Sequence, residues 1–322
     1  MIAALASYLI ACNNSSQAIS NNISFKNTLS AYPLFEGKMR DLLPATGVVT
    51  FHIASTLFTD YAEKQRLLKI PAGSKLVLNG NGLPIFPEGT IIAKTFYYSS
   101  TANGSRQIIE TRLLLLKDKK WNAATYRWND AQTDATLLKD GATVPVMFTD
   151  HTGKKRQLHY KIPTQQDCGS CHRSGDALSP IGPTASNLHI IVDRDGIRQP
   201  QLNYLMHKGI LAQANITSIP SMPDYNDASL AVPVRARAYL DINCAHCHQS
   251  AGIAGNTSIQ LGYSLPFEET GIQFNKQNML VRMHTLGEYH MPKTGTTIVD
   301  EEGLQLVKKY IYSLGAQETS GK

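Results

Sequence analysis

The chain has 322 residues, of which 42% are hydrophobic and 17% are charged, and its formal net charge is +6 at pH 7. This length accommodates two domains of ordinary size, and the composition excludes an intrinsically disordered chain. The basic residues are scattered rather than gathered in one stripe, so we expect no nucleic-acid partner. No apolar run reaches about 18 residues, which excludes a membrane-spanning helix. Five cysteines are the informative feature.

The first cysteine, Cys12, follows an apolar stretch over residues 2–11. This resembles the lipobox of a bacterial lipoprotein signal, in which Cys12 would be acylated and residues 13–17 would form a polar tether. No Lys or Arg precedes Lys26, so a simple cleaved signal peptide or a disordered tail stays open. We expect residues 1–25 to be signal and tether. The protein is then periplasmic, and Asn13 after the cysteine favours a lipid anchor in the outer membrane.

Residues 30–163 carry the short alternating apolar pattern that is typical of β-strands. Asn103-Gly104 indicates a hairpin turn between two of these strands. We expect an all-β sandwich or open barrel here, because strands recur at short spacing with few helical periods. The strands are expected at residues 48–53, 66–70, 90–98, 107–116, 121–128, 144–148 and 156–162.

Beyond Pro163 the pattern changes to helical segments that are separated by proline and glycine loops. Apolar residues at helical spacing predict helices over 201–211 and 232–243. A last helix is expected from Asp300, which caps it, to Gly315.

The other four cysteines form two C-x-x-C-H motifs, the attachment signature of c-type haem. Two thiols three positions apart can each add to a haem vinyl group, and the histidine that follows supplies the proximal iron ligand. We therefore expect two covalently bound haem c groups. The anchors are Cys168 and Cys171 with His172 as the metal ligand, and Cys244 and Cys247 with His248.

Three other uses of these cysteines compete with haem binding. Two C-x-x-C pairs can hold one zinc ion, but the gap between the pairs is much longer than in a zinc ribbon, and zinc does not need both histidines. Redox dithiols are disfavoured because no thioredoxin-like pattern surrounds the pairs. Disulfides would make both histidines accidental.

The sixth iron ligands are expected to be methionines that precede prolines. Met291 lies in a loop before the last helix and is the candidate for the second haem, with Met283 and His290 as competitors. Met222 is the candidate for the first haem by the same reasoning. His189, Met206 and His207 stay open as alternatives there, and so does an unfilled position. Two filled sites indicate electron transfer, whereas one open site permits chemistry.

The chain resembles a family of bacterial exported di-haem cytochrome c-like proteins, which have a β-rich N-terminal region and two C-terminal C-x-x-C-H motifs. The resemblance extends from about residue 30 to 315 and supports haem binding and export, but it implies no substrate. The matching stretches are residues 57–64, 86–90, 94–96, 110–114, 126–129, 132–135 and 235–248.

The expected architecture is multidomain, with the β-rich domain at 30–163 followed by a mostly α, cytochrome c-like haem region. This region divides into a first haem unit at 164–228 and a second cytochrome c-like domain at 229–318. We expect an exported di-haem c-type cytochrome that transfers electrons between redox partner proteins and contacts the membrane only through its lipid anchor. No catalytic residue is assigned.

Two other functions stay open. A di-haem oxidoreductase, such as a peroxide reductase with one open haem site, suits the length and the two motifs. Its layout differs, because bacterial di-haem peroxidases place a haem motif near the N-terminus. In the other alternative the β-rich domain is a binding module, with Tyr126, Trp128 and Asp134 as ligand contacts. Cross-strand packing is the more ordinary role for the two aromatic residues.

Overall fold

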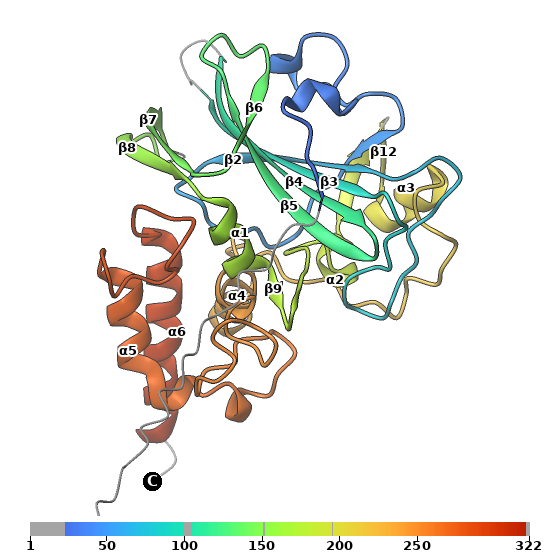
Figure 1. Ribbon diagram of the computed structural model, residues 1–322. Coiled ribbons are helices and arrows are strands. Elements are labelled where there is room, and N and C mark those ends of the chain that lie inside the picture. Colours follow the sequence, from blue (N-terminus) through green and yellow to red (C-terminus); the bar gives the residue numbers. More distant parts are fainter. Residues whose placement is uncertain (1–22, 100–104, 151, 195, 320–322) are drawn as a thin grey trace, which may run out of the picture.

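The computed structural model describes residues 23–99, 105–150, 152–194 and 196–319 (Figure 1). Its body is a six-stranded antiparallel sheet whose strands lie side by side in chain order. A separate antiparallel hairpin follows the sheet. The sheet strands are β1 (Val48–Thr50), β2 (Glu63–Lys69), β3 (Ile91–Ser99), β4 (Arg106–Lys117), β5 (Lys120–Trp128) and β6 (Ala135–Leu138); the hairpin strands are β7 (Ala142–Thr149) and β8 (Lys155–Ile162).

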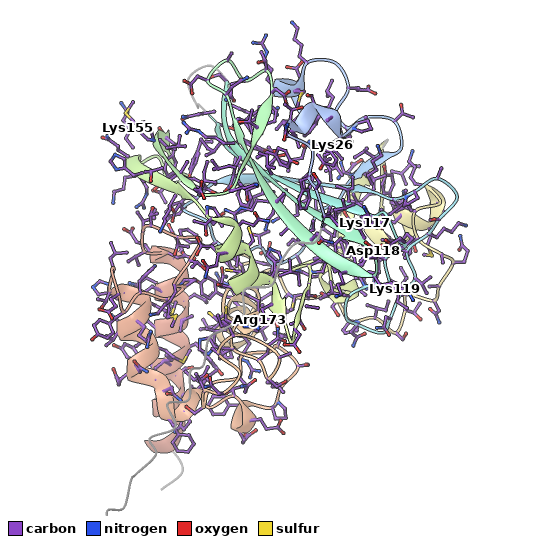
Figure 2. All side chains as sticks on the ribbon, viewed as in Figure 1. Lys26, Lys117, Asp118, Lys119, Lys155 and Arg173 are labelled. Carbon is purple, nitrogen blue, oxygen red and sulfur yellow. The ribbon has the colours of Figure 1, made fainter. Side chains whose placement is uncertain are left out.

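The turn between β4 and β5 sets the register of these two strands. Asp118 and Lys119 both have positive φ, 53° and 60°, as a two-residue hairpin turn requires. The Glu88 carboxylate accepts hydrogen bonds from both of their backbone N–H groups. Figure 2 shows these two residues together with Lys117 at one end of the sheet. Because these two hydrogen bonds fix the turn, they also fix which residues of β4 and β5 face one another.

One face of the sheet is covered by the segment before β1. This segment contains two single-turn helices, η1 (Leu29–Ala31) and η2 (Met39–Asp41). Leu29 and Leu34 pack there against Leu67, Leu113 and Ala124 of the sheet. Burial of these side chains is the hydrophobic stabilisation that holds the segment in place.

The other face of the sheet is covered by residues that follow the hairpin. Leu68, Ile92 and Leu114 form one continuous core with apolar side chains from residues 168–219. This part of the chain therefore packs directly on the sheet. Its elements are α1 (Gln165–His172), β9 (Arg173–Ser174), β10 (Ala177–Leu178), α2 (Ala185–Leu188), β11 (Ile191–Arg194), β12 (Ile197–Pro200) and α3 (Gln201–His207).

The last part of the chain has its own core, in which Tyr239, Leu240, Met279, Val307 and Ile311 are buried. Figure 1 shows α1 between the sheet and this part. None of the helices in the described ranges is both long and apolar enough to cross a membrane. The elements are α4 (Val232–Leu240), η3 (Asp241–Ala245), η4 (Phe267–Glu269), α5 (Ile272–His284) and α6 (Glu301–Thr319).

The expected strands and helices are present within a few residues, but the expected fold class is wrong. The β-rich part is one open sheet with a hairpin, rather than a sandwich or barrel, because non-strand segments cover both sheet faces. The part after residue 163 is not a mostly α cytochrome c-like region. Its first helices are short, and two small hairpins and long loops separate them, since prolines and glycines interrupt the helical pattern.

Candidate functional site

The first C-x-x-C-H motif occupies the second half of α1. This helix begins with a capping box, in which the Thr164 hydroxyl accepts from the Asp167 N–H at 3.1 Å and the Asp167 carboxylate accepts from the Thr164 N–H at 2.9 Å. The cap starts the helix just before Cys168. Cys171 and His172 follow it by three and four positions, so the two thiols and the imidazole share one side of α1.

Cys168 fastens α1 to the sheet. Its Sγ lies 3.8 Å from the Thr125 Oγ1 on β5, and its side chain belongs to the core on that face. Burial raises the pKa of the Cys168 thiol, which therefore stays protonated. All four cysteines within the described residues are free, so none of them forms a disulfide.

The His172 ring is held in one orientation at the end of α1. Its Nδ1 lies 2.8 Å from the carbonyl oxygen of Ser179, to which the ring N–H donates. The Nε2 lone pair is then the one available to a metal. Burial lowers the pKa of His172 to about 3, and the charges of Lys94 and Arg112 contribute. The imidazole is neutral, which is the form that ligates iron.

Two cavities border His172. The first has a volume of about 590 Å³, part of it open to solvent, and Cys168, Cys171 and His172 line it. The second, of about 460 Å³, lies against the sheet and shares His172, Lys94 and Arg112 with the first. The thiols, the imidazole and the sheet thus face a common space.

A row of three cations crosses the sheet beside this space. Arg66 on β2 faces Lys94 on β3, and Lys94 faces Arg112 on β4; all three line the second cavity. Among the described residues, Arg112 alone of the three has an ion-pair partner, Glu110. Burial lowers the pKa of Lys94 to about 7, with a further contribution from Arg66. Adjacent like charges are destabilising, so the row favours an anionic ligand.

The neighbouring row on the same sheet face is apolar. Leu68, Ile92 and Leu114 are paired in register two residues along each strand from the cations. Ile181 and Pro183, from the segment after α1, also line the second cavity. An apolar surface bordered by cations suits a planar hydrophobic group that carries carboxylates. Haem with its two propionates has this chemistry, so the residues at the first motif fit the expected cofactor.

A loop from the end of the chain reaches the first motif. The Oγ1 of Thr294 lies 3.0 Å from the Sγ of Cys171, and residues 294–296 line the first cavity. The buried Asp60 carboxylate accepts from the N–H and the hydroxyl of Thr297 at 2.8 and 2.7 Å. Tyr98 donates to the Asp60 carbonyl oxygen at 2.8 Å. The sheet domain therefore holds this loop beside α1.

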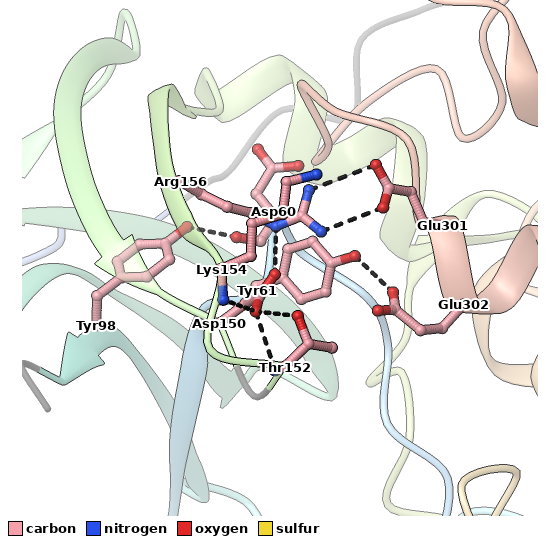
Figure 3. Close-up of polar contacts among 9 residues, drawn as sticks. All are labelled: Asp60, Tyr61, Tyr98, Asp150, Thr152, Lys154, Arg156, Glu301 and Glu302. Carbon is pink, nitrogen blue, oxygen red and sulfur yellow. Dashed lines mark hydrogen bonds and ion pairs between the residues drawn. The ribbon is translucent and has the colours of Figure 1, made fainter.

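A second group of polar contacts ties α6 to the hairpin (Figure 3). Arg156 on β8 donates to Asp150 at 2.6 Å and to Glu301 of α6 at 3.2 Å. The Tyr61 hydroxyl donates to Glu302, also on α6, at 2.5 Å. These contacts position the start of α6, and with it the loop that precedes the helix.

The second C-x-x-C-H motif follows α4, with Cys244 in η3 and the other residues in the next turn. Cys244 packs against the core of α4, α5 and α6. Burial raises the pKa of Cys244 and of Cys247 to about 12. Protonated thiols of this kind are poor redox nucleophiles, which disfavours the dithiol alternative. The Nδ1 of His248 lies 3.3 Å from the Thr257 Oγ1.

The two motifs lie close to one another. Asn243, directly before the second motif, accepts from the Phe58 N–H at 2.7 Å, and Phe58 lines the first cavity. The charge of Cys171 contributes to the raised pKa of Cys247, after burial. Within the described part of the chain, however, no three His, Cys, Asp or Glu side chains are arranged as metal ligands. The four thiols are thus not arranged as one zinc site.

Neither of the predicted methionine ligands lines the first cavity, although Pro292, next to Met291, does. The Met222 N–H donates to the Ser186 carbonyl, and the Met291 N–H donates to the Arg282 carbonyl, both at 2.9 Å. Neither methionine lines the two cavities at His172. Of the competitors, Met283 packs in the core of the last part, and the two ring nitrogens of His290 contact Thr285 and Thr296.

The structure brings forward one residue that the sequence analysis missed, His246. This histidine occupies a variable position of the second motif, yet it lines the first cavity together with His172. Its Nδ1 is buried and has no hydrogen-bond partner among the described residues. Burial lowers the pKa of His246 to about 4; a contact with the carbonyl oxygen of Ile242, which lacks the geometry of a full hydrogen bond, acts in the opposite direction. The sequence signal that could have identified His246 is an additional histidine between the two cysteines of a C-x-x-C-H motif.

The predicted lipidation site, Cys12, lies outside the described residues. Comparison with known proteins found no matching family model, no matching curated protein and no matching solved structure. The resemblance to exported di-haem proteins therefore stays a prediction.

Proposed function

We propose that the protein is an exported c-type cytochrome that carries two covalently bound haem groups and transfers electrons between redox partner proteins. The observation that carries this proposal is the first site. There, two free thiols and a neutral, oriented imidazole face a space whose wall joins an apolar row to a row of cations.

The roles of the residues at the first site follow from their chemistry. Cys168 and Cys171 would each add across a haem vinyl group, so that sulfur bonds to one carbon and the proton goes to its neighbour. The Ser179 carbonyl orients His172 toward iron. Lys94 and its neighbours in the cation row offset the charge of the propionates. Haem supplies a one-electron couple.

The second site would hold its haem with Cys244, Cys247 and His248. Attachment of c-type haem takes place outside the bacterial inner membrane, so this function requires export. The short apolar stretch before Cys12 supports export, and lipidation at Cys12 would place the protein in the periplasm on the outer membrane. Its electron donor and acceptor would be other redox proteins.

The test is to produce the full chain in a bacterial host with its haem-attachment machinery and to measure the intact mass and the haem content. The expected result is two haem groups per chain, retained after denaturation. The Cys12→Ala variant is the matched control, since it should lose any lipid and keep both haems. A chain that carries no covalent haem overturns the proposal.

A further inference from the structure

Two histidines from different motifs meet in one cavity. His172 ends α1, whereas His246 lies between the two cysteines of the second motif, and both line the cavity that contains Cys168 and Cys171. The Ser179 carbonyl occupies one nitrogen of His172. The Nδ1 of His246 is buried and makes no hydrogen bond of normal geometry among the described residues, although the Ile242 carbonyl lies near the ring. A buried, unpaired imidazole nitrogen is unfavourable unless a ligand satisfies it.

The other side chains at this cavity are less suited to bind iron. The Asp167 carboxylate is used in the cap of α1. Lys94 is the remaining amine; it lines this cavity as well as the second one, where it belongs to the cation row, and it is therefore tested below as the competing ligand. Met222 and Met291 line neither cavity.

We propose that His246 is the second axial ligand of the iron whose proximal ligand is His172. This inference rests on the proposed function, because it assigns the sixth position of the first haem. It replaces Met222, which the sequence favoured for that position. The first haem is then ligated by two histidines, one from each motif.

This ligation has a consequence for electron transfer. His246 is separated from Cys247 by one peptide bond, and Cys247 would be bonded to the second haem. The ligand of one iron thus belongs to the loop that anchors the other haem. The protein places a short covalent path between the two haems, and no other residue is needed to connect them.

The test compares the ferric visible and electron paramagnetic resonance spectra of the haem-loaded full chain with those of the His246→Ala variant. One of the two haems should change from low spin to high spin, and added imidazole should restore the low-spin signal. The second haem should keep its spectrum. His159→Ala, at an exposed histidine on β8, is the matched control and should change neither haem.

Two further variants keep the test decisive. His246→Gln retains a polar side chain of similar size, so the same spectra can be measured on this variant if His246→Ala does not fold. Lys94→Leu tests the competing amine with a side chain that cannot bind iron, and a change to high spin in this variant alone overturns the inference. Unchanged spectra in both His246 variants also overturn it while leaving the proposed function intact. Absence of haem from the unmodified protein overturns both.

Discussion

The two C-x-x-C-H motifs have the same pattern but different surroundings. The first lies on α1 against the sheet, beside a row of cations from three strands. The second lies in η3 and the next turn, and it packs against a helical core. Under the proposed function, the motif would supply the same attachment chemistry in both places. The electrostatic environment comes from strands and helices that the motif does not specify.

This difference predicts unequal haems. Positive charge near an iron favours its reduced, less positive state, so under the proposed function the cation row would raise the reduction potential of the first haem above the value it would have without the row. The predictions below test this contrast, in order of decreasing effect.

The largest effects are expected from removing either proximal histidine. His172→Ala and His248→Ala should each abolish the native spectrum of one haem and leave the other unchanged, because each motif supplies its own iron ligand. Visible spectroscopy of the oxidised and reduced protein measures this. Ser170→Ala, inside the first motif, is the control and should keep both haems. A normal spectrum in either histidine variant would show that its proximal assignment is wrong.

The second prediction concerns the cation row. Lys94→Met removes a buried positive charge, so the potential of the first haem should fall while that of the second stays unchanged. In the protein without haem, the same variant should raise the free energy of unfolding by about 1–3 kcal/mol, because an unpaired buried ammonium is lost. Lys117→Met, at the exposed end of β4, is the control and should change neither quantity.

The pH dependence of this stability gain has a definite sign. Burial lowers the pKa of Lys94 from 10.5 to about 7, so protonation of Lys94 disfavours the folded state. The haem-free wild type should therefore lose stability relative to Lys94→Met as the pH falls from about 10.5 to 7, with no further relative loss below that range. Denaturation curves at several pH values measure the difference. A constant difference across this range would contradict the assignment of the gain to Lys94 titration.

The strands could be predicted from the sequence, because alternating apolar residues mark them. Which segments of the chain cover each face of the sheet could not be predicted in this way. In β3, the pattern over residues 91–97 indicated one buried face. The structure buries Ala93 on that face and also Ile92 on the other, under different segments of the chain. Lys94 lies on this second face, so a lysine that a half-exposed strand would direct to solvent lines a cavity instead.

The candidate site, too, could be predicted only where it depends on local sequence. Sequence spacing identified Cys168, Cys171 and His172, because these residues depend on a single helix. The position of His246 depends on how the second motif packs against the first, which local spacing does not encode. The sixth-ligand prediction assumed that each motif has its own methionine loop, but residues 294–296 of the later loop lie at the first motif.

The third prediction tests whether that loop is held over the first motif. Asp60→Ala leaves the N–H and the hydroxyl of Thr297 without their acceptor and should lower the free energy of unfolding by about 1–3 kcal/mol. Hydrogen exchange should increase over residues 292–298. Asp60→Asn is the matched control with a smaller effect, because it keeps one acceptor oxygen and tolerates the positive φ of 52°. Unchanged exchange in the loop of Asp60→Ala would show that the loop is held by other contacts.

The smallest effect is expected at the ion pair between the hairpin and α6. Glu301 is largely exposed, so Glu301→Gln should lower the free energy of unfolding by at most about 1 kcal/mol, and less in high salt. Hydrogen bonding to Arg156 lowers the pKa of Glu301 below 4.5, so the stabilisation should be complete above that pH and lost as the pH falls through the lowered pKa. A double-mutant cycle with Arg156→Gln isolates this pair from the contact between Arg156 and Asp150. Since the pair joins α6 to the hairpin, a coupling energy of zero would mean that the two motif regions are held together by packing and by the other hydrogen bonds, those of Asp60, Tyr61 and Phe58.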